Sequence, residues 1–190
     1  MRTNPERRQA LLDGAIEVLA RDGARGLTFR AVDKEAAVPA GTASNYFANR
    51  DDLLTQVCGR YYERLQPSAD TMSMLTDAPK TTDTITELMT EVVERVAGFR
   101  TGYLAQLELR LEAVRRPELR AILTERVRAD LDFNVRNHLD SAMPGDETTV
   151  VLLYLALNWL ILESLTLPDI FGEQQRRDLV RAAVERAIGG

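Results

Sequence analysis

Hydrophobic and polar residues recur along nearly the whole chain with a period near 3.6, the spacing that buries one face of an α-helix. No convincing segment alternates with the period of two that is typical of a half-buried strand. We therefore predict an all-α protein of about nine helices.

Local start and stop signals divide the first 66 residues into short helices. Asn4 and Pro5 suit the start of the first helix, and Gly23 suits its end. Thr28 is a good N-cap for a second, short helix because its hydroxyl can accept an orphan backbone N–H. These residues predict two helices joined by a tight connection.

A break and two further helices follow. Pro39 pushes the residue before it toward extended backbone and prevents one continuous helix. We predict a third short helix carrying residues 42–47, and a fourth that Asn49 caps. Short helix, turn, short helix and longer helix together form the layout of a three-helix helix-turn-helix DNA-binding domain, although the pattern alone makes this only plausible.

Residues 66–79 contain two prolines among Ser, Thr and Asp, which indicates a linker or a frayed short helix. We place the domain boundary there, between residues 1–66 and residues 67–190. Amphipathic segments over 85–96, 104–114 and 119–135 predict that the second domain is a helical bundle.

The segment 150–162 is apolar around its whole circumference except at Asn158. Such a helix must be covered on more than one side, and the segment is too short to span a bilayer. We expect one side to face its own domain and another to meet a second subunit, together with the small residues of the last helix. The predicted dimer interface comprises Val151, Tyr154, Leu155, Leu162, Val180, Ala183, Val184 and Ala187.

Composition and charge add only modest constraints. With 190 residues, 45% of them hydrophobic, the chain can bury a good core. Ten basic and nine acidic side chains leave residues 1–65 at +1, although the whole chain carries −5. A DNA-binding head on an acidic body has this asymmetry, and so do many unrelated proteins. We see no secretory signal and no transmembrane segment, so we expect a cytoplasmic protein without a membrane partner.

The sequence gives little indication of a catalytic site or a metal site. Cys58 is the single cysteine and His138 the single histidine, so we predict no metal site, no cofactor and no disulfide. Glu108 and Glu112 share a helix face, but a solvated charged face is the simpler interpretation, and Glu112 can also pair with Arg116. With no phosphate loop and no nucleophile motif, we predict no catalytic residue, and an enzyme is the weakest class.

The head resembles the TetR family of transcriptional regulators. The match is dispersed from residue 11 to residue 54, and its matching positions are Ala15-Ile16, Gly23, Leu27-Thr28, Val32, Ala36, Val38, Gly41-Thr42, Tyr46-Phe47 and the run Arg50–Leu54. The resemblance implies that residues 39–46 form the recognition helix and that nearby residues hold the phosphate backbone. The residues expected at DNA are Thr28, Pro39, Ala40, Gly41, Thr42, Ser44, Asn45, Tyr46 and Arg50, with Arg2, Arg7 and Arg8 adding phosphate contacts from the N-terminal arm.

Three positions depart from the usual pattern of this family. Ala37 stands where the turn commonly has Gly, Pro39 where a Ser would cap the recognition helix, and Ser44 where an aromatic residue often sits. The hydrophobic skeleton of the motif is intact, but these departures put the individual phosphate contacts in question.

For the second domain the resemblance implies a small-molecule site in the bundle core, a homodimer and a palindromic DNA operator. The residues expected at the ligand are Phe99, Tyr103, Leu107, Phe133, Trp159 and Glu163, although the aromatic ones are most simply core or interface residues. The implied function is a repressor that its ligand releases from DNA. An activator, a ligand-insensitive regulator, or a helical ligand-binding module without DNA affinity are the alternatives.

Overall fold

The computed structural model describes residues 4–189, apart from the side chains of residues 74 and 75. Within that range it contains nine α-helices, one 3₁₀ turn and no strand, as the hydrophobic periodicity predicts. The chain divides into two compact units, each built from two stretches of sequence. Unit 1 comprises Met1–Gln66 and Phe99–Arg126, and unit 2 comprises Pro67–Gly98 and Val127–Gly190.

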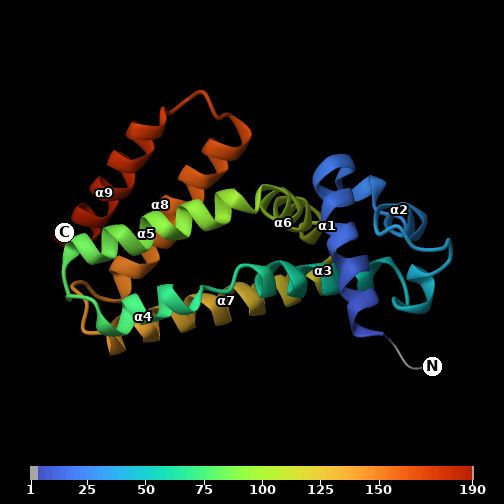
Figure 1. Ribbon diagram of the computed structural model, residues 1–190, viewed down its shortest axis with the longest axis horizontal. Helices are drawn as coiled ribbons and strands as arrows, with labels where there is room; N and C mark the ends of the chain where they lie inside the picture. Colours follow the sequence, from blue (N-terminus) through green and yellow to red (C-terminus); the bar gives the residue numbers. More distant parts are fainter. Residues whose placement is uncertain (1–3, 190) are drawn as a thin grey trace. The chain divides into compact units, whose positions relative to one another are not determined.

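Unit 1 holds the predicted head together with α6 (Arg100–Ala113) and the first part of α7 (Pro117–Asp140) (Figure 1). Its other elements are α1 (Pro5–Gly26), α2 (Phe29–Glu35), the 3₁₀ turn η1 (Ala43–Asn45) and α3 (Arg50–Arg64). Helix α1 is central, because it packs against α2, α3 and α6. The core of the unit includes Leu11, Ile16, Leu19, Phe47, Leu54 and Leu109, each at most 1% exposed.

Side-chain caps fix the helix starts of the head. The side chain of Asn4 accepts a hydrogen bond of 3.2 Å from Arg7 N–H, and Thr28 Oγ1 accepts one of 3.1 Å from Ala31 N–H. Asn49 Oδ1 accepts one of 2.9 Å from the N–H three residues on. All three predicted caps are confirmed.

The end of α1 contains a break at Gly23. This residue has φ 66° and ψ −178°, a backbone conformation that only glycine adopts readily, and a short helical stretch continues to Gly26. The prediction that the first helix ends at Gly23 is therefore confirmed for its regular part, and residues 24–26 extend it beyond the break.

Unit 2 contains α4 (Ala69–Asp77), α5 (Thr82–Gly98), the rest of α7, α8 (Glu147–Thr166) and α9 (Glu173–Gly189). The segment expected to be a linker or short helix is thus helix α4. Figure 1 shows α5, α8 and α9 side by side, and each packs against the other two. Two clusters form their core, one of Ile85, Leu88, Met143, Leu153 and Val184, the other of Leu157, Leu160 and Val180.

Helix α8 is longer than the apolar segment that predicted it. A capping box at Asp146 and Thr149 starts it, and it runs for 20 residues. By length and composition alone such a helix is long enough to cross a membrane, but a core helix of a soluble protein passes the same test. Its residues Leu153, Leu157, Leu160 and Ile161 are buried inside unit 2.

Candidate nucleic-acid interface

Residues 39–46, which we call the 39–46 turn, connect α2 to α3 as a tight turn rather than a helix. The predicted third helix over 42–47 is wrong in extent, because only Ala43–Asn45 forms a 3₁₀ turn. Gly41 has φ 88°, which ends any regular helix there, and Pro39 has no N–H to donate. The backbone closes instead through a bond of 3.1 Å from Thr42 N–H to Pro39 C=O.

The polar side chains of the 39–46 turn bond to its own backbone. Ser44 Oγ donates to Gly41 C=O at 2.8 Å, and Asn45 Nδ2 donates to the same oxygen at 3.0 Å. Thr42 Oγ1 donates to Pro39 C=O at 2.5 Å. Ser44 and Asn45 remain exposed, so the turn presents short polar side chains at the surface in an ordered conformation.

One buried residue that sequence reasoning missed holds this turn from behind. Asp33 of α2 is 2% exposed, and its two carboxylate oxygens accept hydrogen bonds of 2.7 Å from Gly41 N–H and from Ala43 N–H. The available signal was its position directly after the buried Val32 in a seven-residue helix. A carboxylate on that face needs polar partners, and the exposed N–H groups of the next turn are the nearest source.

The turn between α2 and Pro39 contains a strained residue. Ala37, which stands where the TetR pattern has Gly, has φ 52° in the left-handed region. A Cβ atom disfavours that region, so the substitution of Ala for Gly costs stability without changing the path of the chain.

The remaining predicted DNA contacts differ in how available they are. Thr28 is exposed, and Tyr46 packs partly against the core of unit 1. Arg50, expected at a phosphate, points its guanidinium into the protein: it donates to Ala24 C=O, and at 3.3 Å to Leu27 C=O. These bonds make Arg50 an anchor for the end of α1.

The N-terminal arm is described only in part, since Arg2 lies outside the described residues. Arg7 is exposed. Arg8 donates to Gln56 Oε1 at 2.5 Å and lies 5.8 Å from the ring centroid of Phe47. Of the arginines expected to add phosphate contacts, Arg7 therefore has the more accessible side chain.

Glu108 and Glu112 of α6 do not form the solvated face we expected. Glu108 Oε2 accepts a hydrogen bond of 3.0 Å from Ala24 N–H, and the Glu112 side chain is only 14% exposed. Glu112 Oε2 lies 2.9 Å from Arg116 Nε, which confirms the predicted pair, and 4.0 Å from Arg50 Nη1. The hydrogen bond from Arg116, with the charges of both arginines, lowers the pKa of Glu112.

The six residues expected at a ligand fall in different units. Phe99, Tyr103 and Leu107 belong to unit 1, where Tyr103 is buried and Phe99 lies 3.7 Å beneath the Arg64 guanidinium. Phe133, Trp159 and Glu163 belong to unit 2. Phe133 is 45% exposed and Trp159 64%, so neither is enclosed by its own unit.

The residues expected at a dimer interface also separate into two groups. Val180 and Val184 are buried inside unit 2, at 2% and 0% exposed, and so belong to its core. Leu155 is 58% exposed and shares one face of α8 with Leu152 and Trp159 at helical spacing. The remaining predicted residues, Val151, Tyr154, Leu162, Ala183 and Ala187, are half-buried.

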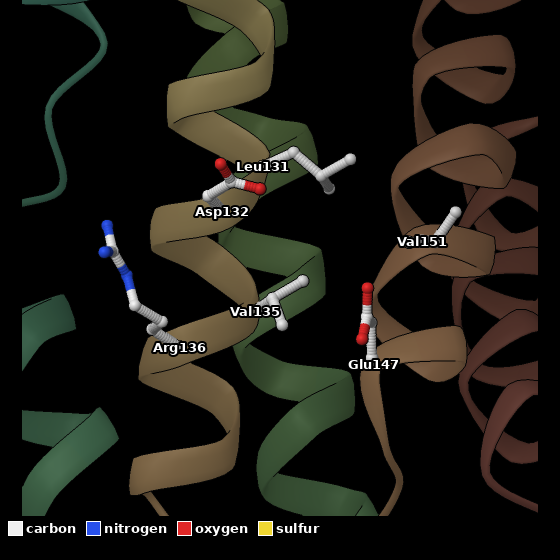
Figure 2. Close-up of a pocket in the computed structure, with 6 residues that line it drawn as sticks. All are labelled: Leu131, Asp132, Val135, Arg136, Glu147 and Val151. Carbon is white, nitrogen blue, oxygen red and sulfur yellow. The ribbon is translucent and has the colours of Figure 1, made fainter.

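A shallow groove of about 270 Å³ lies in unit 2 between α7 and α8 (Figure 2). Leu131, Val135 and Val151 point toward it with the carboxylate of Glu147, whereas Arg136 points away from α8. Asp132 completes the lining. None of the six residues expected at a ligand lines this groove.

Comparison with known proteins agrees with this architecture. Residues 11–57 match the family described as bacterial regulatory proteins, tetR family. Residues 80–190 match the family described as tetracyclin repressor-like, C-terminal domain. The second match includes α8, so the long apolar helix belongs to this C-terminal domain.

Two curated repressors are similar in sequence. HdnoR, a nicotine-responsive transcriptional repressor of Paenarthrobacter nicotinovorans, is 25% identical over 146 residues, covering 76% of this chain and 73% of that protein. KstR, a transcriptional repressor of Mycolicibacterium smegmatis, is 31% identical over 74 residues, 39% of this chain. The match spans only about a third of KstR, 36% of its length.

Two solved structures are similar along nearly the whole chain. A TetR-family member from Streptomyces coelicolor A3 is 28% identical with a TM-score of 0.72, covering 97% of this chain and 99% of that one. The multidrug binding protein EbrR, solved with ethidium, is 30% identical with a TM-score of 0.67, covering 95% and 99%. The fold and the head therefore define a DNA-binding transcriptional regulator. The chain belongs to the TetR family.

Proposed function

We propose that this protein is a dimeric repressor that a small-molecule effector releases from a palindromic operator, acting in the cytoplasm. The observation that carries the proposal is the 39–46 turn, which presents Ser44 and Asn45 at the surface while Asp33 anchors it from the core. Short polar side chains on an ordered element suit hydrogen bonding to base edges and phosphates. Residues 1–66 would read DNA, and residues 67–190 would bind the effector and dimerise.

The exposed apolar face of α8 supports the dimer. Leu152, Leu155 and Trp159 are 49%, 58% and 64% exposed, and such a contiguous apolar face is costly unless a partner covers it. A two-fold axis through paired α8 helices gives each subunit the same contact surface. Two identical heads then read two half-sites of opposite direction, which is why the operator would be palindromic.

We infer that the effector carries a positive charge. In unit 2, Glu163 Oε2 on α8 is buried without a hydrogen-bond partner, whereas Glu91 on α5 already pairs with Arg95 through its Oε1 at 3.2 Å. A buried carboxylate oxygen without a donor is unfavourable, and a cationic ligand would relieve that cost. The ethidium bound to EbrR is a cation, and nicotine, to which HdnoR responds, is a basic amine.

Within unit 1, a movement of α6 would be transmitted to the head. This helix belongs to unit 1, where it packs extensively against α1 and where Glu108 bonds to Ala24. A shift of α6 would therefore move α1 and the head, and an effector-bound state of this kind would leave two heads that no longer fit successive major grooves.

The test is footprinting on the DNA that flanks the protein's own gene, repeated over a salt series and with nicotine, which does not intercalate into DNA, as a probe cation. A repressor of this kind gives a symmetric footprint that weakens steeply as salt rises and that the cation abolishes. The double variant Thr42→Ala/Asn45→Ala is expected to lose the footprint, while the matched surface variant Thr124→Ala/Asn134→Ala keeps it.

Each outcome separates the alternatives. A protein without salt-sensitive DNA binding is a ligand-binding module only. A footprint that nicotine and other organic cations that do not intercalate leave unchanged contradicts the effector class. An activator gives the same footprint but raises transcription from the adjacent promoter in a reporter assay.

A further inference from the structure

We propose that Asp33 is a positioning residue for DNA recognition: its buried carboxylate sets the conformation of the 39–46 turn without touching DNA. This inference rests on the proposed role of that turn. Asp33 would thus contribute to operator affinity although it lies in α2 and makes no contact with DNA.

The 39–46 turn lacks a side-chain cap at its start. Thr42 N–H bonds to Pro39 C=O, so Pro39 occupies the position whose side chain normally accepts the orphan N–H groups two and three residues on. Proline has no side-chain oxygen. Thr42, which precedes η1, gives η1 no side-chain cap, because its hydroxyl donates back to Pro39 C=O.

Asp33 of the neighbouring helix α2 supplies acceptors for two backbone N–H groups of the 39–46 turn. Its Oδ2 accepts from Gly41 N–H and its Oδ1 from Ala43 N–H, each at 2.7 Å, and the bond to Ala43 is fully buried. Bonds from N–H groups to an ionised carboxylate are short and strong, and two of them from one rigid side chain fix orientation as well as distance. The 39–46 turn is therefore clamped to α2.

The clamp holds the residues that face outward. Ser44 and Asn45 both donate to Gly41 C=O, so the conformation of Gly41 sets where their side chains lie. Gly41 has φ 88° and no atom within 4 Å of the place a Cβ would take, so neighbouring side chains do not hold it. The hydrogen bond from Gly41 N–H to Asp33 holds Gly41 in place, and its loss would displace the side chains of Ser44 and Asn45.

The experiment compares Asp33→Ala and Asp33→Asn with wild type for binding to operator and to random duplex, under conditions where circular dichroism shows each variant folded. We expect Asp33→Ala to weaken operator binding about tenfold or more while leaving random-duplex binding nearly unchanged. The Asn side chain keeps one acceptor oxygen, but its NH₂ group would face the second of the two N–H groups, Gly41 or Ala43, and could not accept from it. Asp33→Asn should therefore also weaken operator binding. The matched control is Asp13→Asn, which breaks ion pairs with Arg60 and Arg64 elsewhere in unit 1.

A rescue separates positioning from general stability. Pro39→Ser in the Asp33→Ala background places a hydroxyl where it can accept from Gly41 or Thr42 N–H, and we expect it to recover a large part of operator affinity. In wild type, amide hydrogen exchange at Gly41 and Ala43 should be slow. This measurement tests the clamp even if a variant fails to fold, and fast exchange at both amides contradicts it.

The results also distinguish this inference from the function on which it rests. If Thr42→Ala/Asn45→Ala leaves operator binding unchanged, the turn does not face DNA and the role of Asp33 falls with it. If that variant loses the operator but folded Asp33→Ala and Asp33→Asn bind within twofold of wild type, the assignment of Asp33 alone is wrong.

Discussion

The carboxylate of Glu108 in α6 accepts a hydrogen bond of 3.0 Å from the backbone N–H of Ala24 in α1, across 84 positions of sequence. The contact depends on Gly23, which leaves the helical conformation immediately before Ala24. A Cβ atom added to Gly23 would lie 3.3 Å from Glu108 Oε2, closer than most such contacts. The break in α1 thus both orients an N–H group toward α6 and makes room for the carboxylate.

Replacing Glu108 tests this link. We expect Glu108→Ala to lower the free energy of unfolding by about 1–3 kcal/mol, because it leaves the partly buried N–H of Ala24 without its acceptor. Glu108→Gln keeps a neutral acceptor and should cost less. Urea denaturation gives both values, with the exposed Glu118→Ala in unit 1 as the control. Equal stability of Glu108→Ala and Glu118→Ala would contradict the link.

Sequence reasoning recovered those features that depend on neighbouring residues. The caps at Asn4, Thr28 and Asn49 bond to N–H groups three residues on, and the helical periodicity reports which face of each helix is apolar. Both signals are local, so no knowledge of the tertiary packing was needed. The same locality explains why Pro39 correctly predicted a break in the chain.

The features that sequence reasoning missed depend on distant partners. Arg50, expected at a phosphate, bonds to the carbonyl of Ala24, 26 residues earlier, a partner that no local pattern indicates. The pattern of α8 is apolar on all sides, and it gave no means to decide which side faces the core. Trp159, expected at a ligand site, lies on the exposed face with Leu155.

Ala37 offers a stabilising substitution. Because its φ is 52°, Ala37→Gly removes the strain of a Cβ atom in the left-handed region and should raise the free energy of unfolding by about 1 kcal/mol. Thermal melting measures this change. Ala142, with φ 57° in unit 2, should respond in the same direction. Ala31→Gly inside α2 should instead destabilise by about 1 kcal/mol; a Gly at position 37 that destabilises as much would disprove the strain.

Cys58 should be inert to thiol reagents in the folded protein. It is 2% exposed, and burial raises the pKa of its thiol from 9.0 to about 11. The positive charges of Arg126 and Arg110 lower this pKa, but by less than burial raises it. The thiolate is therefore scarce at pH 8, and alkylation should be slow until a denaturant unfolds the chain. Rapid labelling of the folded protein at pH 8 would contradict the burial.

The same pKa shift predicts how stability depends on pH. Well below pH 9 the thiol is protonated in the folded and in the unfolded chain, so Cys58 contributes its full stabilisation to the folded state. As the pH rises above 9, the unfolded chain loses this proton first, and the free energy of unfolding falls until the folded chain also loses it near pH 11. Relative to Cys58→Ala, wild type should lose about 3 kcal/mol across that window. The difference between the two proteins isolates Cys58 from lysines and tyrosines that titrate there, and a constant difference would contradict the shift.

The exposed face of α8 gives the prediction that decides the quaternary structure. Leu155→Glu places a charge at the centre of the face formed by Leu152, Leu155 and Trp159, where pairing of two α8 helices would bury it without a partner. Analytical ultracentrifugation should therefore show wild type as a dimer and Leu155→Glu as a monomer. Operator affinity should fall with it, because one head alone reads one half-site.

Two exposed residues, Leu139 and Trp159, supply a control variant and a fluorescent reporter for this experiment. Leu139 of α7 is 53% exposed, so Leu139→Glu makes the same chemical change outside the α8 face and should leave the dimer intact. Trp159 is the single tryptophan, 64% exposed within its own chain, so its emission should shift to longer wavelength when dilution separates the subunits. A wild-type emission maximum that stays constant while the sedimentation coefficient falls would place Trp159 outside the interface, and a dimer that survives Leu155→Glu would move the interface away from α8.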